Sequence, residues 1–350
     1  MSYGVFLLNM GGPSTLDEVR PFLVNLFSDN DIIPLPIGPR AQRVFGTIFG
    51  SLRGRRDGKV AKSYQAMGGG SPQRRESEMQ ARALAARLDA EAPEGAPWKT
   101  YVCMRYAAPM TDEAIAAARR DGIDTLVVLP LYPQYSATTT GSNLNELARQ
   151  MAVQRWRPRT LHIVRDYHDD PAYLDALAGS VARTLEGLPE EKRAKAHLFF
   201  SAHSIPMRVV RTGDLYPPQI EATTKGVMER LARRGIPNRH TLAWQSRVRP
   251  FSEWLGPQTD ATIEELAAKG EKHLVVVPVA FVGEHIETLI EIDQEYGELA
   301  HSKGIETFVR VPCLRDDPAF IGALAGIVRR AAGFEGAAEG RREETVAGAR

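Results

Sequence analysis

The strongest structural signal in the chain is LVVVPVAFVGEHIETLIEIDQE, residues Leu274–Glu295. Its first part, Leu274–Ala280, is a continuous apolar and largely β-branched run, which predicts a strand buried on both faces, as in a parallel sheet covered by helices. The run ends at Phe281-Val282-Gly283, and a helix is predicted to begin directly afterwards. This strand-then-helix pattern predicts an α/β fold.

Acidic residues and one histidine mark the predicted helix. Glu284, His285 and Glu287 fall in its first turn, and Glu287, Glu291 and Glu295 follow one another at a spacing of four residues along one face. In open α/β sheets, ligands bind beyond the carboxyl ends of the strands, where this turn would lie. Two interpretations fit: a solvated helix face, or half of a metal-handling site.

Length and composition indicate a soluble enzyme. The 350 residues suffice for two domains or one large α/β unit. Hydrophobic residues make up 43%, charged residues 25%, and the net charge is +1. Because nucleic-acid binders normally carry a strong basic excess, we expect no nucleic-acid partner.

The two cysteines and the N-terminus indicate the compartment. Cys103 and Cys313, both expected within strands, are too few for a disulfide framework or a cysteine-based metal site, which suits a reducing cytoplasm. The apolar run in MSYGVFLLNMGGP is too short for a signal peptide or a membrane span. We therefore expect a first strand there and a cytoplasmic location.

Strand and helix patterns alternate along the whole chain, which implies a parallel, doubly wound sheet. Thr15 and Glu18 form a potential capping box at the first helix. The predicted strands include Gly4–Asn9, Lys99–Arg105 and Thr125–Leu131, and the predicted helices include Thr15–Phe27, Thr111–Arg120 and one near Asp317–Arg330.

The sequence also repeats. DDPAY at Asp169 returns as DDPAF at Asp316, an offset of 147, and LVVLP at Leu126 returns as LVVVP at Leu274, an offset of 148. Such a shared register predicts two similar Rossmann-like halves, each a parallel sheet flanked by helices, with a ligand cleft between them. We place the first half at 1–165, the second half with the catalytic residues at 166–315, a final helix packing back on the first half at 316–332, and a disordered tail at 333–350.

The first half contains about 45 extra residues, which we describe as a lip insertion at about 31–75. Within it, Phe45, Ile48, Phe49 and Leu52 recur at helical spacing among five arginines. A basic amphipathic helix of this kind fits a packed helix, a membrane-surface element, or a lip that grips an apolar ligand with carboxylates. We favour the lip, and we also expect peripheral membrane contact through residues 40–56.

A second histidine is predicted at the end of a strand. The segment HLFFSAHSIP predicts a core strand that carries His203 at its carboxyl end. By the repeat, the first-half counterpart of His203 is Met10, and those of His285 and Glu287 are Ala137 and Thr139. The scaffold is duplicated, but these ionisable groups are predicted in the second half alone. One imidazole with several carboxylates suits a divalent ion such as iron that is held and then released.

Common enzyme motifs are missing. The chain has no G-x-G-x-x-G, G-x-x-x-x-G-K-[ST], H-E-x-x-H or G-x-S-x-G sequence, which removes the simplest nucleotide, zinc-peptidase and serine-hydrolase interpretations. The glycines of Gly68–Pro72 fit either an anion cradle or a flexible turn. Trp244 and Trp254 fit either the core or the wall of a site for a flat aromatic ligand.

Several motifs closely resemble those of the ferrochelatase family, in order and over roughly Tyr3 to Ala331. They are LNMGGP at Leu8, GGGSP at Gly68, YPQYS at Tyr132, TTGS at Thr139, FSAHSIP at Phe200, WQSRVRP at Trp244, WLGPQTD at Trp254 and HIETL at His285. The resemblance implies two Rossmann-like halves around a porphyrin cleft. It also implies insertion of Fe²⁺ into protoporphyrin IX to give protoheme, with release of two protons, as the last step of heme synthesis.

The resemblance assigns roles to particular residues. His203 and Glu287 match the two key active-site residues, which would handle the metal and the porphyrin protons, and His285, Glu291 and Glu295 would serve as a proton or metal relay. Arg105 and Ser71 are candidates for propionate contacts. The residues in motifs that line the family's cleft are Met10, Tyr64, Ser71, Arg105, Tyr106, Tyr132 and Trp254.

The resemblance leaves alternatives and departures. Coproporphyrin III is the other ferrochelatase substrate, and a non-catalytic tetrapyrrole carrier is an alternative of another class. Glu284 stands where the family usually has Asp. Some relatives hold a [2Fe–2S] cluster through cysteines, but the tail from Gly333 has none, so we predict no cluster and no tightly bound cofactor, with Fe²⁺ as a substrate.

Overall fold

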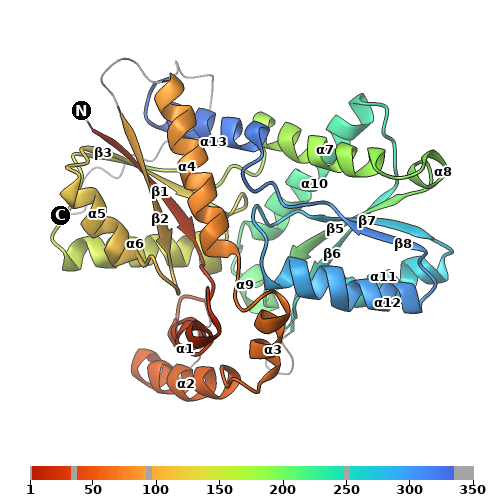
Figure 1. The fold of residues 1–350 in the computed structure, drawn as a ribbon, viewed down its shortest axis with the longest axis horizontal. Helices are drawn as coiled ribbons and strands as arrows, with labels where there is room; N and C mark the ends of the chain where they lie inside the picture. The colour runs from red at the N-terminus through yellow and green to blue at the C-terminus, as the bar shows by residue number, and fades with distance from the viewer. Residues whose placement is uncertain (1, 33–37, 92–96, 248–252, 335–350) are drawn as a thin grey trace.

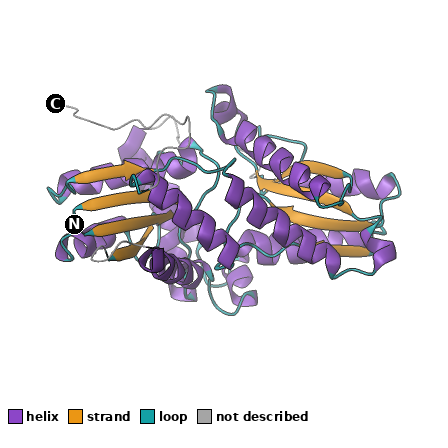
Figure 2. Ribbon diagram, turned by 90° about the horizontal axis from the view of Figure 1, so that it is seen from above, coloured by secondary structure: helices purple, strands orange, loops and turns teal. Residues whose placement is uncertain are grey.

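Two parallel four-stranded sheets form the scaffold, as predicted. The computed structural model describes residues 2–32, 38–91, 97–247 and 253–334. The strand orders are β2-β1-β3-β4 and β6-β5-β7-β8, so the second half repeats the topology of the first. Figure 2 shows the sheets at opposite ends of the molecule, flanked by helices. The strands are β1 Tyr3–Asn9, β2 Trp98–Met104, β3 Thr125–Pro130, β4 Thr160–Ile163, β5 His197–His203, β6 His240–Gln245, β7 His273–Pro278 and β8 Thr307–Arg310.

Helices connect successive strands and cover the sheets (Figure 1). The β7 run is buried at every position, as its continuous apolar sequence predicts. The helices are α1 Val19–Ser28, α2 Gly38–Arg53, α3 Lys59–Ala66, α4 Gln73–Glu91, α5 Thr111–Arg120, α6 Ser142–Val153, α7 Pro171–Glu186, α8 Glu190–Arg193, α9 Met207–Arg211, α10 Tyr216–Arg233, α11 Thr259–Ala268, α12 Gly297–Ser302 and α13 Pro318–Ala331, with π-helices at Ala137–Gly141 and Glu287–Tyr296.

The helices α7 and α13 cross between the halves. Helix α7 follows β4 but contacts β7, and α13 follows β8 but contacts β3 and α4. The two helices pack on each other, as Figure 1 shows. Arg183 donates to Asp317 at 2.7 Å, and Arg330 donates to Asp170. Both members of the second pair lie 147 positions from their counterparts, so the two ion pairs are the same contact made twice.

The lip insertion packs through glycines. Gly46 and Gly50 on α2 face α1, where an added Cβ would lie 2.4 Å from the Ser28 nitrogen and 2.7 Å from the Val24 Cα. This close approach leaves the opposite, apolar face of α2 uncovered: Val44, Ile48 and Leu52 are all about 60% exposed (60%, 59% and 59%). Phe45 and Phe49 stack on each other at 5.2 Å between the two faces.

One local prediction in the first half needs correction, and one open alternative is decided. Thr15 is not the first residue of an α-helix and makes no side-chain cap; a 3₁₀ turn precedes α1, and the Glu18 carboxylate accepts the Ser14 N–H at 2.7 Å instead. The glycine loop is a packed turn, because the N–H groups of Gly68, Gly69 and Ser71 bond to backbone carbonyls of the protein itself. An anion would find those three donors already occupied.

Cys313 was expected within a strand, and this was wrong. Strand β8 ends at Arg310, and Pro312, which has no N–H to donate, precedes the cysteine. The Cys313 N–H donates to the Glu284 carboxylate at 3.0 Å rather than to a neighbouring strand. Both cysteines are buried. The predicted tail falls largely on residues 335–350, which lie outside the described residues.

We predict that Gly46→Ala destabilises the lip by about 1–3 kcal/mol, because the added methyl group would overlap the backbone of Ser28. Thermal unfolding and the rate of trypsin cleavage after the arginines of α2 would measure the effect. Thr47→Ala, at the next and exposed position, is the matched control. Equal cleavage rates for the two variants would contradict the close packing described above.

Candidate functional site

The carboxyl ends of three neighbouring strands meet at one edge of the second sheet. Strand β5 ends with His203, β6 is followed by Ser246, and β7 is followed by the turn that leads into the π-helix Glu287–Tyr296. Because β5 lies between β6 and β7, these three groups converge. The topology thus brings together residues that are up to 84 positions apart in the chain (287 − 203).

His203 and Glu287 form the central pair of the site. The His203 Nδ1 lies 3.1 Å from the Glu287 Oε2. Burial lowers the pKa of His203, but the negative charges of Glu287 and Glu291 outweigh burial and hold it above its usual value. Burial raises the pKa of Glu287, but His203 outweighs it, so the carboxyl remains ionised.

Ser246 joins Glu287 to a second carboxylate. Its hydroxyl contacts the Glu287 Oε2 at 3.1 Å and the Glu291 Oε2 at 2.5 Å, and its N–H donates to the Glu291 Oε1 at 2.9 Å. Tyr296 donates to the same carboxylate at 2.7 Å. Burial and the nearby Glu287 charge raise the pKa of Glu291. Ser246, whose backbone φ is 63°, therefore holds the ionised Glu287 beside Glu291, which binds a proton more readily.

The helix after β7 is not the expected α-helix in its first ten residues. It is a π-helix, and its first-half counterpart at Ala137–Gly141 is one too. Wide turns of this kind are rare and concentrate at functional sites. The predicted single row of acids is divided: Glu287 and Glu291 face Ser246, whereas Glu295 reaches the exposed Lys59 at 3.1 Å. Glu284 turns away and accepts from Arg310 at 3.0 Å.

His285 is buried beside the central pair. Its Nδ1 accepts the Thr288 N–H at 3.4 Å, and its ring lies edge-on to Phe281 with centroids 4.3 Å apart. Burial lowers the pKa of His285 below its usual value despite the nearby Glu287 and Glu284 charges. The two imidazoles thus differ: His203 takes up a proton readily, and His285 remains neutral.

A cleft lies between the two halves, with about 120 Å³ open to a water-sized sphere and about 890 Å³ in all when the space that opens to solvent is included. The first half contributes Asn9, Leu131 and other residues to the lining, and the second half contributes Ile205, Tyr216 and the turn after β7. Of the residues predicted from the sequence, those that line it are Met10, Tyr132, His203, His285 and Glu287.

Tyr64 and Trp254 lie beside the lining residues. Tyr64 of α3 is buried in a cluster with Met10 and Ile286, so the lip contacts the wall of the cleft. The Trp254 ring is edge-on to His203, with centroids 6.4 Å apart. Trp244, by contrast, is part of the core. Of the two tryptophans, only Trp254 is placed to contact a ligand next to His203.

The two proposed propionate contacts are bound to protein groups. The Arg105 guanidinium donates to Asp29 at 2.8 Å and lies 3.6 Å from Glu146. Tyr106 donates to the same Asp29 carboxylate at 2.6 Å. Ser71 is buried, and its hydroxyl accepts the Gln73 N–H at 3.3 Å. Neither Arg105 nor Ser71 is among the residues that line the cleft.

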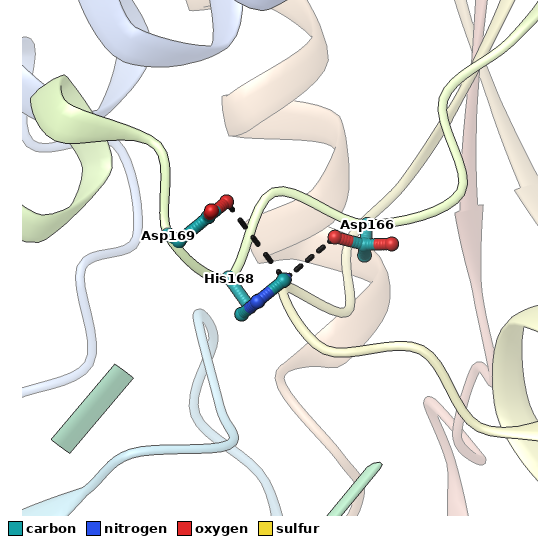
Figure 3. Close-up of side chains that lie close together, drawn as sticks. All are labelled: Asp166, His168 and Asp169. Carbon is teal, nitrogen blue, oxygen red and sulfur yellow. Dashed lines mark hydrogen bonds and ion pairs between the residues drawn. The ribbon is translucent and has the colours of Figure 1, made fainter. Parts of the chain in front are cut away.

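A separate group of ionisable side chains lies on the segment between β4 and α7 (Figure 3). The His168 Nδ1 is 2.6 Å from Asp166 and 3.9 Å from Asp169. None of the three lines the cleft. The close hydrogen bond to Asp166 accounts for the position of the imidazole, so we assign no ligand to this group.

Comparison with known proteins identifies the family. The family model described as Ferrochelatase matches residues 2–332. The chain is 46% identical over 329 residues to the ferrochelatase of Rippkaea orientalis (strain PCC 8801 / RF-1), covering 93% of this chain and 82% of that protein. It is also 46% identical to the ferrochelatase of Synechococcus sp. (strain JA-2-3B'a(2-13)), covering 93% and 92%. The chain belongs to the ferrochelatase family.

A solved structure supports the fold. The structure titled SirB from Bacillus subtilis with Fe³⁺ aligns with a TM-score of 0.53 over 95% of this chain and 96% of that chain, at 14% identity. The two-half, Rossmann-like chelatase architecture is therefore confirmed. Ferrochelatases are lyases that insert a metal ion into a tetrapyrrole, so the chain is an enzyme of that class, with iron and porphyrin as its substrates.

Sequence reasoning missed two residues of this ferrochelatase site. Ser246 lies within the WQSRVRP motif, and its position directly after a strand next to β5 was the available signal. Glu76 lines the cleft from α4, but an acid in the first turn of a helix is common and gives no such signal. Distances between segments far apart in the chain were needed to find Glu76.

We predict that Glu287→Gln lowers the pKa of His203 by about 1–3 pH units, because it removes the charge that raises it and leaves burial in place. NMR of ¹³C-labelled histidine would follow the titration, with His203→Gln to assign the signal. Glu298→Gln, an exposed acid on α12, is the control and should leave the titration unchanged. An unaltered His203 midpoint in Glu287→Gln would show that the pair does not interact in solution.

Proposed function

We propose that this chain inserts Fe²⁺ into protoporphyrin IX to form protoheme and two protons, the terminal step of heme synthesis. The observation that supports it best is the His203–Glu287 pair, which lies in the wall of a cleft formed by two Rossmann-like halves. The reaction balances as a porphyrin with two N–H groups plus Fe²⁺, giving the neutral iron porphyrin and 2 H⁺. The site must therefore accept protons and admit a dication.

His203 accepts the first proton in this proposal. An imidazole in the cleft wall can take the N–H proton of a pyrrole as the metal enters, and the adjacent Glu287 carboxylate stabilises the resulting imidazolium. The raised pKa of His203 has that carboxylate as its cause, so the pair favours proton uptake. The same carboxylate offers an oxygen ligand to the incoming Fe²⁺, and His203 a nitrogen ligand.

Protons then leave along the π-helix. Ser246 bridges Glu287 to Glu291, and the pKa of Glu291 is raised, so this second carboxyl can hold a proton between turnovers. Glu295, one turn on, is at the surface beside Lys59. His285 remains neutral and orients the first turn of the helix through Thr288. The path thus leads from a buried carboxylate to solvent.

The porphyrin occupies the cleft, with its ring between the halves. Met10 and Tyr132 contact it from the first half, opposite His203, and Trp254 lies against the ring edge near that imidazole. Tyr64 and Tyr106 form the lip side of this site. Ser71 and Arg105 remain our candidates for the propionates, although neither lines the cleft in this structure; Arg105 would keep its contact with Asp29 and exchange the one with Glu146 for a ligand carboxylate.

Two other functions are less well supported. The relatives named ferrochelatase do not favour coproporphyrin III or a non-catalytic carrier. A carrier would retain heme tightly and insert no iron, and it would gain nothing from a carboxyl poised to release protons. A comparison of the two porphyrins as substrates distinguishes the first alternative.

Peripheral membrane contact is a further part of this proposal. No helix in the described part of the chain is long and apolar enough to span a bilayer. Helix α2 nevertheless exposes Val44, Ile48 and Leu52 in one row, with Arg40 and other arginines nearby, a pattern that suits the surface of an anionic bilayer. The exposed row, rather than Phe45 and Phe49, would enter the membrane.

We expect His203→Ala to lower kcat by about 10²–10⁴-fold, the usual contribution of a general base. The assay is anaerobic incubation with Fe²⁺ and protoporphyrin IX, followed by loss of porphyrin fluorescence. His168→Ala, outside the cleft, is the control and should keep the wild-type rate. Unchanged turnover in His203→Ala would refute its role, and a wild type that binds heme but inserts no iron would favour the carrier.

We also expect Val44→Ser/Ile48→Ser/Leu52→Ser to abolish flotation with vesicles of anionic phospholipid at low salt, because it removes the exposed apolar row. Wild type should float with the vesicles. Val153→Ser, which replaces an exposed valine (75%) at the end of α6 outside the lip, is the matched control and should float normally. Equal flotation of wild type and the triple variant would count against membrane contact.

A further inference from the structure

Each half holds a turn of the other half through a carboxylate. Glu76, in the first turn of α4, accepts the N–H of Glu284 in the second half at 2.6 Å. Asp214, just before α10, accepts the N–H of Ala137 in the first half at 2.8 Å and contacts the Ser136 hydroxyl at 3.1 Å. Ser136 lies 148 positions before Glu284, the offset of the repeat, whereas the N–H that Asp214 accepts belongs to the next residue, so the two carboxylates hold corresponding turns through neighbouring positions.

The second-half contact is the more elaborate. Gln80, four residues after Glu76 on the same face of α4, donates to the Val282 carbonyl at 3.1 Å and to the Arg315 carbonyl at 3.0 Å. The Arg315 guanidinium lies 3.0 Å from the Glu76 carboxylate, and its backbone has a positive φ of 49°. Helix α4 thus bonds both to the turn that leads into the catalytic helix and to the segment around Arg315.

The space around Glu76 leaves little freedom. Its side chain is 3% exposed, and its Oε2 lies 3.2 Å from where a Cβ on Gly283 would stand. The carboxylate therefore sits directly against the backbone that leads to His285. Without Glu76, the N–H of Glu284 would be an unsatisfied donor in a buried turn, which costs about 1–3 kcal/mol.

We propose that Glu76 is a positioning residue for the catalytic turn: by accepting the Glu284 N–H across the cleft, it fixes where His285 and Glu287 stand relative to the first half. The inference rests on the proposed iron insertion, since it assigns Glu76 a part in that reaction. Glu287 must meet His203 from a different strand, so a displaced turn separates the pair. Asp214 holds the matching turn of the first half through the Ala137 N–H and the Ser136 hydroxyl.

Two conservative variants separate positioning from ion pairing. Glu76→Asp keeps the charge that Arg315 can follow, but it withdraws the carboxylate by one carbon–carbon bond, roughly 1.5 Å. That takes the 2.6 Å contact with the Glu284 N–H out of hydrogen-bond range. Glu76→Gln keeps the length and an acceptor oxygen but loses the charge. Glu78→Gln, a half-exposed acid on the same helix paired with Arg74, is the control.

The measurements are kcat in the iron-insertion assay, the dissociation constant of protoporphyrin by fluorescence, and the thermal midpoint. Positioning predicts that Glu76→Asp loses about tenfold to hundredfold in kcat with porphyrin affinity unchanged. Glu76→Gln, which keeps an acceptor oxygen at the same length, should lose less kcat than Glu76→Asp, and Glu78→Gln should keep the wild-type kcat. A role limited to the ion pair predicts the reverse order, with Glu76→Gln the more impaired in both kcat and thermal midpoint.

Two outcomes would overturn the inference. The reverse order would do so, and so would equal kcat values for Glu76→Asp and Glu76→Gln in an enzyme whose wild type is active. Failure of the wild type to insert iron would instead refute the proposed function, and this inference with it. The two failures are therefore distinguishable by the wild-type assay alone.

Discussion

The contact between His203 and Glu287 is the interaction around which the site is built. Both side chains are only partly buried, so solvent screens their attraction and the contact depends on its geometry being maintained. His203 comes from the end of β5 and Glu287 from the helix after β7, so two separate strand ends must remain in register. The hydrogen bonds of Ser246 and the packing of His285 supply that support.

The duplicated scaffold provides the register. Both sheets have the same strand order, and helices α7 and α13 are exchanged between them, each secured by an arginine to the N-terminal aspartate of the other. Since the N-terminal Asp of each helix also accepts N–H groups of its own first turn, one carboxylate serves both the helix and the other half. The cleft is thereby fixed from both sides.

Much of the scaffold could be predicted from the sequence, because its signals are local or periodic. The apolar run Leu274–Ala280 and the 147–148 offset predicted the buried strand and the two halves, and both are confirmed. Cys313 and the cap at Thr15 were wrong because backbone donors there bond to distant or neighbouring carboxylates, which no pattern records. The π-helix was missed because its acids also fit α-helical spacing.

The site residues also divide into those with a local sequence signal and those that depend on contacts between distant segments. His203 and Glu287 were found because they lie at or just after the ends of strong strands and match residues of the family's motifs. Ser246 and Glu76 act across segments whose proximity depends on the completed fold. Both halves contain a π-helix after the corresponding strand and a carboxylate that holds it, yet only the second half has ionisable side chains there. The contacts that hold these turns therefore do not depend on the chemistry: they are required wherever two halves must define a cleft. An imidazole and two carboxylates then become useful because the backbone that carries them is already fixed.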